Sequence, residues 1–510
     1  MRKSGILMHI TSLPSPYGIG TMGKEAYRFI DFLKKSGQKY WQILPVTPTG
    51  YGDSPYQSCS TYAGNHYLID LDLLVQEGLL KKSEITKINW SDDPSRVNFG
   101  HLYYHRLDVL RLAYGRFQRT EAFETFCHDN DTWIWDFAMF MALKAKHGGK
   151  PWHQWEEKLK FRDDAALTKA WHELEQEVYF HCFIQYLFHI QWENLRTYAH
   201  ENGVQIIGDV PIYVPYDSAD VWSNPHLFDL DEALNPVAVA GCPPDGFNAD
   251  GQLWGNPLYR WDVHKEERFA WWIRRMGAAG NRYDMVRLDH FRGFESYWAV
   301  PYGDETARGG KWMKGPGMDF VNAMRDNLPH VQMIAEDLGF LTQEVKDLQK
   351  ASGYPGMKVL LFAFDSREPS DYLPHSYIPN SVCYTGTHDN VTTRQWFDTA
   401  PKAAAKYARE YLRIAQDEGD VWGMIRGAMA CVSELCVIPM QDYLELGGEA
   451  RMNFPGTRSS SNWTWRATKG YLSAALSKRI YRLTELYGRL EIEKEETNGK
   501  ADQLPLEMEI

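Results

Sequence analysis

Short apolar runs alternate with helix-like segments along almost the whole chain, and this alternation restricts the possible folds more than any other feature. Eight of the runs have the length of a strand, and several segments between them end on a glycine, as helices often do. The runs lie at residues 5–10, 40–45, 204–209, 283–289, 331–336, 357–364, 381–386 and 436–440. Eight strand–helix units predict an α/β protein whose fold is a (β/α)8 TIM barrel.

The spacing of the runs is uneven, which predicts two insertions in the barrel. About 160 residues separate the second and third runs, more than a crossover helix needs, so we expect a mainly helical subdomain over 60–190. Residues 212–262, between the third and fourth runs, are rich in turn formers, and we expect an irregular loop subdomain over the barrel mouth. The predicted organisation is one barrel domain over 1–492 and an acidic tail over 493–510.

Composition excludes several other classes of protein. The chain has 55 Lys and Arg against 67 Asp and Glu, a net charge of −12, which argues against nucleic acid as a partner. No run approaches the roughly 18 consecutive apolar residues of a membrane span. Seven cysteines without a CxxC pair indicate neither a disulfide framework nor a zinc ribbon and fit a reducing cytoplasm. A doubly wound nucleotide-binding sheet is disfavoured because no GxGxxG follows a predicted strand.

Charged residues stand at the ends of four of the predicted strands. In a barrel of this kind the chemistry lies at the carboxyl ends of the strands, which meet at one mouth. A single acid at such a place could equally be structural, for example as a helix N-cap. Several carboxylates gathered at one mouth would repel one another, so together they indicate a functional site. The residues are Asp209, Arg287 with Asp289, Glu336, and His388 with Asp389.

Two of these acids suit sugar chemistry. A retaining glycosidase uses a carboxylate nucleophile and a carboxylic acid about 5–5.5 Å apart, and Asp289 and Glu336 end neighbouring predicted strands. Arg287 lies two residues before Asp289, on the same face of the strand, where it would keep Asp289 ionised as the nucleophile. Neighbouring anions and partial burial should raise the pKa of Glu336, as a general acid requires.

Aromatic residues make up 14% of the chain, which suits a large core but also the stacking of rings on sugar faces. Tyr56 and Trp254 stand in polar, turn-rich loops, so we expect them to be functional. Trp271 and Trp272 stand on a predicted helix face, and we expect them in the core.

The segments IIGDVPIYV, DMVRLDHFRG, MIAEDLG and YTGTHDN, in this order, resemble the four short motifs of the α-amylase superfamily. Longer segments, namely SLPSPYGIGTMG, WQILPVTPTGYGDSPYQSCSTYAGN, GCPPDGFNADGQLWGNPLYRW and RMNFPGT with NWTWR, resemble the 4-α-glucanotransferases of glycoside hydrolase family 77, also called amylomaltases or disproportionating enzymes. The resemblance extends from about residue 4 to residue 466.

This resemblance implies a role for each matching residue. Asp289 matches the nucleophile, Glu336 the acid/base, and Asp389 a third carboxylate that holds the 2- and 3-hydroxyls of the reacting glucose. The implied substrate-binding residues are Asp209, Arg287 and His388 in the same subsite, Tyr56 under the reacting sugar, and Asp245, Gln252 and Trp254 in a loop on the acceptor side. The implied substrates are malto-oligosaccharides and other α-1,4-glucans, with no metal and no cofactor.

Two other functions stay open at this point. An α-glucan hydrolase would share the same double displacement, with water instead of a sugar hydroxyl as the acceptor. A non-catalytic glycan-binding barrel would keep the fold without turnover, although all three carboxylates are present. The long segments over the predicted barrel mouth favour transfer.

Overall fold

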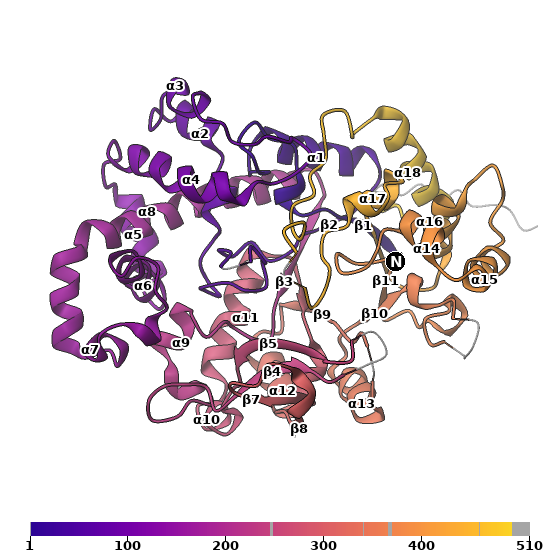
Figure 1. The fold of residues 1–510 in the computed structure, drawn as a ribbon. Helices are drawn as coiled ribbons and strands as arrows, with labels where there is room; N and C mark the ends of the chain where they lie inside the picture. The colour runs from indigo at the N-terminus through magenta and orange to yellow at the C-terminus, as the bar shows by residue number, and fades with distance from the viewer. Residues whose placement is uncertain are drawn as a thin grey trace, which may run out of the picture.

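The fold is a closed barrel of eight parallel strands in a computed structural model that describes residues 2–50, 52–244, 248–339, 341–365, 370–457 and 459–491 (Figure 1). In order round the barrel the strands are β1 (Lys3–Leu7), β2 (Tyr40–Gln42), β3 (Gln205–Val210), β6 (Met285–Leu288), β9 (Gln332–Ala335), β10 (Gly356–Val359), β11 (Ser381–Tyr384) and β12 (Leu435–Pro439). Each of the eight predicted runs contributes one strand, so the predicted (β/α)8 barrel is confirmed. Most strand residues are buried, because helices outside and side chains inside cover both faces.

Several strands are shorter than their apolar runs, most clearly β10. The run 357–364 ends as a strand at Val359, and a 3-10 helix over Leu360–Phe362 follows. Leu360 and Leu361 are nevertheless buried. The run therefore stays apolar because it remains in the interior, not because the strand continues.

Helices pack around the barrel with amphipathic faces turned inward. In α1 (Lys24–Lys35), for example, Phe29, Ile30 and Leu33 are fully buried while the lysines at its end are exposed or half-exposed. The other helices outside the insertion between β2 and β3 are α9 (Ala219–Ser223), α10 (Trp261–Glu266), α11 (Ala270–Arg282), α12 (Met318–Asn327), α13 (Gln343–Ser352), α14 (Thr393–Thr399), α15 (Lys402–Leu412), α16 (Asp420–Ala430), α17 (Met440–Tyr443) and α18 (Ala474–Leu486).

The segment between β2 and β3 is largely helical. It holds α2 (Leu71–Gln76), α3 (Lys82–Thr86), α4 (Phe99–Tyr114), α5 (Glu121–Asp129), α6 (Ile134–Lys146), α7 (Glu157–Lys160) and α8 (Asp164–Glu201). The 38-residue helix α8 passes the expected boundary at 190 and packs against both α6 and α1. One helix thus joins the insertion to the barrel wall, and a separate subdomain over 60–190 stays a prediction.

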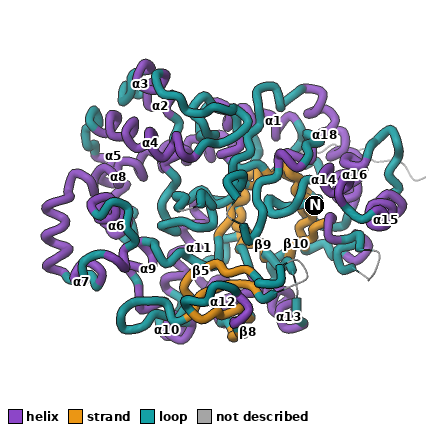
Figure 2. Tube along the Cα trace, viewed as in Figure 1, coloured by secondary structure: helices purple, strands orange, loops and turns teal. Residues whose placement is uncertain are grey.

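A second sheet stands beside the barrel, where we expected an irregular loop. Four antiparallel strands lie in the order β5 (Gln252–Pro257), β4 (Ala238–Cys242), β7 (Ser296–Pro301) and β8 (Lys311–Lys314) (Figure 2). The expectation of irregular structure is wrong for β4 and β5, because β4 pairs on one side with β5 and on the other with β7, from the segment that follows β6. Glycine is needed in β4, since a Cβ at Gly241 would lie 2.5 Å from the Gln252 carbonyl oxygen.

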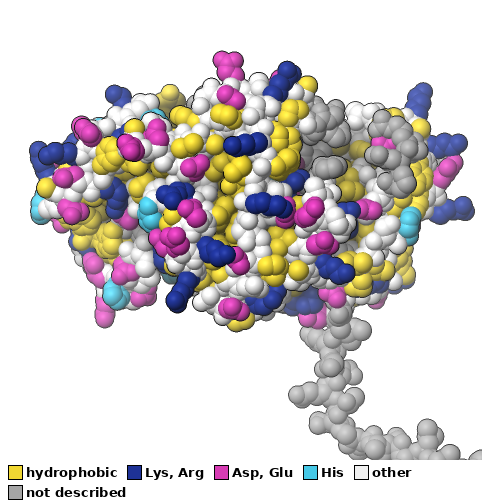
Figure 3. All heavy atoms as spheres, turned by 90° about the horizontal axis from the view of Figure 1, so that it is seen from below, with side chains coloured by type: hydrophobic (Ala, Val, Ile, Leu, Met, Phe, Trp, Pro, Cys, Tyr) yellow, Lys and Arg dark blue, Asp and Glu magenta, His cyan; other side chains and the backbone are white. Residues whose placement is uncertain are grey.

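The described part of the chain ends soon after α18, and the predicted acidic tail over 493–510 lies outside the described residues. No helix among the described residues is long and apolar enough to cross a membrane. On the face drawn in Figure 3 acidic and basic side chains alternate without gathering into a field of one sign.

Candidate active site

The predicted site residues converge at the carboxyl ends of β3, β6, β9 and β11. Asp209 lies in β3 directly opposite Arg287 in β6, and Asp289 and Glu336 each follow the end of a strand. The backbone N–H groups of Asp289 and Glu336 donate to Val210 and to Leu288, at 3.0 and 3.1 Å. The sheet hydrogen bonds thus continue past the strand ends and fix both carboxylates on the rim of the barrel.

A single guanidinium joins two of the acids. Nη1 of Arg287 donates to both carboxylate oxygens of Asp209, at 2.9 and 2.8 Å, and to Oδ1 of Asp289 at 2.8 Å. The Arg287 side chain is only 3% exposed. Burial lowers the pKa of Arg287, but Asp209 and Asp289 outweigh it and raise this pKa well above the ordinary value. The guanidinium is therefore a permanent cation next to Asp289.

Tyr56 makes a further contact to Asp209. Its hydroxyl donates to Oδ2 of Asp209 at 2.8 Å, and its ring stacks on His388, with the centroids 5.2 Å apart and the planes at 13°. Burial and the nearby Asp209 raise the pKa of Tyr56 well above its usual value, so the hydroxyl stays a donor. Burial lowers the pKa of His388, which keeps its ring neutral. The two rings form a flat, uncharged wall at the site.

Glu336 is held by the backbone. Its Oε2 accepts the N–H of His290 at 2.7 Å, and its Oε1 accepts the N–H of Leu338 at 2.9 Å. These two bonds lower its pKa, but burial first and Asp289 second raise it to about 8. Glu336 therefore carries a proton at neutral pH, in agreement with the direction that we expected from the sequence.

Asp389 lies in the turn after β11 and is held from a distant part of the chain. Its Oδ1 accepts a hydrogen bond from Nδ2 of Asn453 at 2.6 Å, and its Oδ2 lies 3.3 Å from Nε2 of His388. The Asp389 side chain is 40% exposed, more than that of Asp289 at 27%. This carboxylate can therefore meet a ligand that enters from solvent.

The second sheet reaches the site through Trp254, which lies with Gln252 in β5 and not in the loop predicted for both. The Trp254 ring stands edge-on to His290, with centroids 4.9 Å apart, and its Nε1–H donates to the side-chain oxygen of Gln252 at 3.2 Å. A Cβ added at Gly456 would lie 3.6 Å from Cγ of Gln252, so β5 lies next to the segment that carries Asn453. Asp245, predicted in the same loop, lies outside the described residues.

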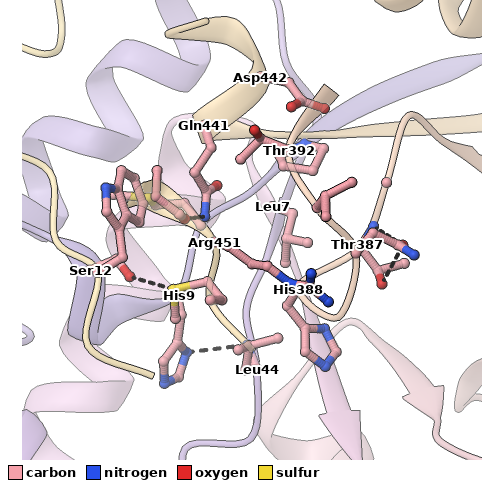
Figure 4. A pocket seen from close by; sticks show the side chains of 18 residues that line it. Leu7, His9, Ser12, Leu44, Thr387, His388, Thr392, Gln441, Asp442 and Arg451 are labelled. Carbon is pink, nitrogen blue, oxygen red and sulfur yellow. Dashed lines mark hydrogen bonds between the residues drawn. The ribbon is translucent and has the colours of Figure 1, made fainter. Parts of the chain in front are cut away.

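Two cavities flank the carboxylates. One encloses about 460 Å³ and is lined by His9, His388, Gln441 and Arg451 among others (Figure 4). The other, of about 530 Å³, is lined by Tyr56 and Asp209 together with residues of α11. Asp289 and Glu336 line neither of these two cavities but lie on the rim beside them. Among the described residues no group of three or more His, Cys, Asp or Glu could hold a metal ion.

Besides Leu338, three residues that contact the acids were not among those predicted. His290 has a left-handed backbone, with φ of 52°, which turns its N–H toward Glu336. Arg451 and Asn453 contact Asp389 from 62 and 64 positions away. The motif that contains Asp289 also contains His290, but neither periodicity nor spacing indicates the contacts of Asn453.

The chain matches proteins of one family over nearly its whole length. A profile of the family described as 4-alpha-glucanotransferase matches residues 8–472. The 4-alpha-glucanotransferase of Clostridium butyricum is 48% identical over 488 residues, which cover 95% of this chain and 100% of the relative. That of Thermus thermophilus is 45% identical over 506 residues, covering 96% of this chain and 99% of the relative.

A solved structure leads to the same family. The amylomaltase from Streptococcus agalactiae, determined in complex with acarbose, superposes with a TM-score of 0.94 at 41% identity, covering 96% of this chain and 100% of that one. The profile match, the two relatives and this structure agree, and the chain belongs to the 4-alpha-glucanotransferases of glycoside hydrolase family 77.

Proposed function

We propose that this protein transfers a segment of a 1,4-α-D-glucan to the 4-hydroxyl of an acceptor glucose or glucan by a retaining double displacement. Family membership supports the activity. The observation that carries the mechanism is the contrast between two neighbouring acids. Asp289 is bonded to a permanent cation, whereas Glu336 is kept protonated by burial.

In the first step Asp289 attacks the anomeric carbon and Glu336 gives its proton to the departing glycosidic oxygen. Arg287 bonds only Oδ1 of Asp289, and Oδ2 has no hydrogen bond to any described residue, so Oδ2 is the oxygen positioned for attack. The C1–O4 bond breaks as the C1–Oδ2 bond forms, which leaves a glycosyl-enzyme and a shortened glucan with a new 4-hydroxyl.

In the second step Glu336, now a carboxylate, removes the proton from the acceptor 4-hydroxyl. The acceptor oxygen attacks C1, the bond to Asp289 breaks, and Glu336 is protonated again. Asp389 supports both steps by accepting hydrogen bonds from the hydroxyls of the reacting glucose, while Tyr56 stacks on that ring.

The partition between transfer and hydrolysis depends on the two loops over the site. Trp254 and Gln252, in β5 next to the first loop, stand on the acceptor side, and the segment at Gly456, in the second loop, lies beside Gln252. A sugar held by these loops presents its hydroxyl in place of water, which favours transfer over the hydrolase alternative.

Incubation with maltotriose alone tests the proposal. A transferase produces glucose and a ladder of longer oligosaccharides, with no net gain of reducing ends. Maltose and glucose without longer products would show a hydrolase. No products from the wild-type protein would favour a glycan-binding barrel.

The protein is proposed to act in the cytoplasm. This location is supported by the odd number of cysteines, none of them in a CxxC pair. Immunodetection in separated cell fractions of the source organism tests it, since recovery in an extracytoplasmic fraction would contradict this location.

A further inference from the structure

Among the described residues of its own turn, the third carboxylate is contacted only by His388, whose Nε2 lies 3.3 Å from Oδ2. Asp389 follows the end of β11 by five positions, within a turn held by the Thr387 N–H and hydroxyl on Oδ1 of Asn390, at 2.8 and 3.0 Å. These bonds fix the backbone of the turn but not the direction of the Asp389 side chain. The carboxylate is also 40% exposed, so packing does not fix it.

Residues 451–457, which we call the strap, supply the missing contacts. Asn453 donates its side-chain N–H to Oδ1 of Asp389 at 2.6 Å and its backbone N–H to the carbonyl of His388 at 3.1 Å. Arg451 donates from Nη2 to the Asp389 carbonyl at 2.8 Å. The strap therefore contacts both His388 and Asp389, through side-chain and backbone groups.

The strap is itself built to hold this position. Nε of Arg451 donates to the carbonyl of Asn453 at 2.8 Å, and its guanidinium lies 4.3 Å from the centre of the Phe454 ring. Asn462 accepts the N–H of Phe454 at 3.1 Å from further along the chain. Behind the turn, His388 and Arg451 line the first of the two cavities (Figure 4).

We propose that Asn453 is a positioning residue, which orients Asp389 so that Oδ1 is occupied and Oδ2 faces the hydroxyls of the reacting glucose. This inference rests on the proposed function, in which Asp389 supports the transition state. Without the Asn453 amide the Asp389 carboxylate would rotate between side-chain conformers. It would then be in the orientation that supports the transition state for only part of the time.

The test removes the donor of the hydrogen bond from Asn453 to Asp389 and puts an acceptor in its place. Asn453→Asp keeps the size of the side chain but replaces the donor with an acceptor, so two carboxylates face each other at neutral pH. Their mutual repulsion raises the pKa of the pair, and below that pKa a shared proton restores an O–H donor to Asp389. The other charged or titratable groups facing Asp389 are His388, Arg451 and Tyr56. His388 and Tyr56 stay neutral and Arg451 stays charged, so among the groups that face Asp389 the new pair alone changes charge. Burial raises the pKa of Asp209, beside Tyr56, to about 7, but this titration is common to the variant and the wild type.

We expect Asn453→Asp to lower kcat on maltotriose by about 100-fold or more at pH 7 and to regain most of this loss by pH 5. The quantity to follow is the ratio of variant to wild-type kcat across pH. Any fall in kcat at low pH that both enzymes share cancels in this ratio. Asn453→Ala, which has no new charge, should lose roughly 10–100-fold in kcat at every pH, with KM nearly unchanged.

Asn462→Asp is the matched control, since among the described residues this amide bonds only to backbone groups and to the Thr457 hydroxyl in the same loop. It should show no recovery at low pH. A constant ratio for Asn453→Asp, the same pH response in Asn462→Asp, or an Asn453→Ala variant with raised KM and normal kcat would each overturn the inference. Should Asn453→Asp not fold, the kcat and KM of Asn453→Ala decide alone.

Asp389→Asn separates this inference from the proposed function. If that variant is as active as wild type, Asp389 has no role and the proposed function itself is wrong at this residue. If it is inactive while the Asn453 variants behave like wild type, only the positioning role of Asn453 is wrong.

Discussion

At the scale of single residues, the contacts of Asp289 predict the effect of removing its charge. Asn in this position keeps an oxygen for Arg287 but cannot form a stable ester with C1, so Asp289→Asn should fold normally and lose roughly 10⁴-fold or more in kcat. A fluorinated glucosyl donor should label the wild-type peptide that contains Asp289, as seen by mass spectrometry. Turnover of maltotriose at near wild-type rate by the variant would exclude Asp289 as the nucleophile.

The raised pKa of Glu336 predicts the alkaline limit of activity. The free enzyme needs this proton for the first step, so kcat/KM should fall as pH rises through about 8. Glu336→Gln should abolish transfer from maltotriose but retain formation of the glycosyl-enzyme from α-glucosyl fluoride, whose leaving group needs no proton. An unchanged alkaline limb in this variant would assign the limb to another group.

The same proton affects stability. Because the pKa of Glu336 is raised on folding, the folded state binds the proton more tightly than the unfolded state. The resulting stability is complete below the unfolded pKa of about 4.5 and is lost as pH rises to about 8. The difference in free energy of unfolding between Glu336→Gln and wild type should therefore shift in favour of the variant over this range. Parallel pH profiles of the two proteins in urea titrations would contradict the assignment.

Asp389→Asn should reduce kcat more than it changes KM. A carboxylate that accepts sugar hydroxyls binds more tightly as positive charge develops on the ring, and such preorganised contacts are worth about 2.7–4 kcal/mol, or roughly 10²–10³ in rate. Steady-state kinetics with maltotriose give both constants. A variant with only a raised KM would make Asp389 a ground-state binding residue.

At the scale of elements, β5, which carries Trp254, and the loop that joins it to β4 should decide the fate of the glycosyl-enzyme. Water is present at about 55 M, and a well-oriented acceptor reaches an effective molarity of roughly 10⁵ M, so transfer wins only while the acceptor is held. Trp254→Ala removes the ring that stands against His290 and should raise the ratio of new reducing ends to transferred glucosyl units. Trp254→Phe keeps a ring and serves as the control. A uniformly lower rate with an unchanged ratio would show that the strap alone holds the acceptor.

The sequence predicts the elements whose signal is local. Each barrel strand is an apolar run of its own, and the acids follow directly after the runs, so both the barrel and the placement of Asp289 and Glu336 could be inferred. The second sheet could not, because β4 and β5 lie in a segment rich in glycine and proline and β4 depends on pairing with β7, about 60 positions later. The bond between Asn453 and Asp389 is hidden for the same reason, since it joins residues 64 positions apart.

At the scale of the whole molecule, one hydrophobic core extends from the barrel into the helical insertion. The main cluster of buried residues runs from Ile6 in β1 to Ile480 in α18 and includes Phe183 in α8. A small separate cluster joins Val239 and Val300 of the second sheet to Ala307, in the 3-10 helix Ala307–Gly309 between β7 and β8. The insertion therefore shares its core with the barrel, and α8 is the element common to both (Figure 1).

A continuous core predicts that the insertion and the barrel unfold together. Phe183 is fully buried against Tyr114 and Phe117, with ring centroids 5.4 and 4.7 Å away, so Phe183→Ala should cost about 3–5 kcal/mol. Calorimetry should show a single transition moved down by several degrees, and activity should be lost over the same range. Phe161→Ala, at a ring 47% exposed, is the control and should leave the transition in place. The contrary result would be a second transition at lower temperature in Phe183→Ala, with activity kept through it. The insertion would then unfold as a domain of its own, and the loss of packing around α8 would not destabilise the barrel.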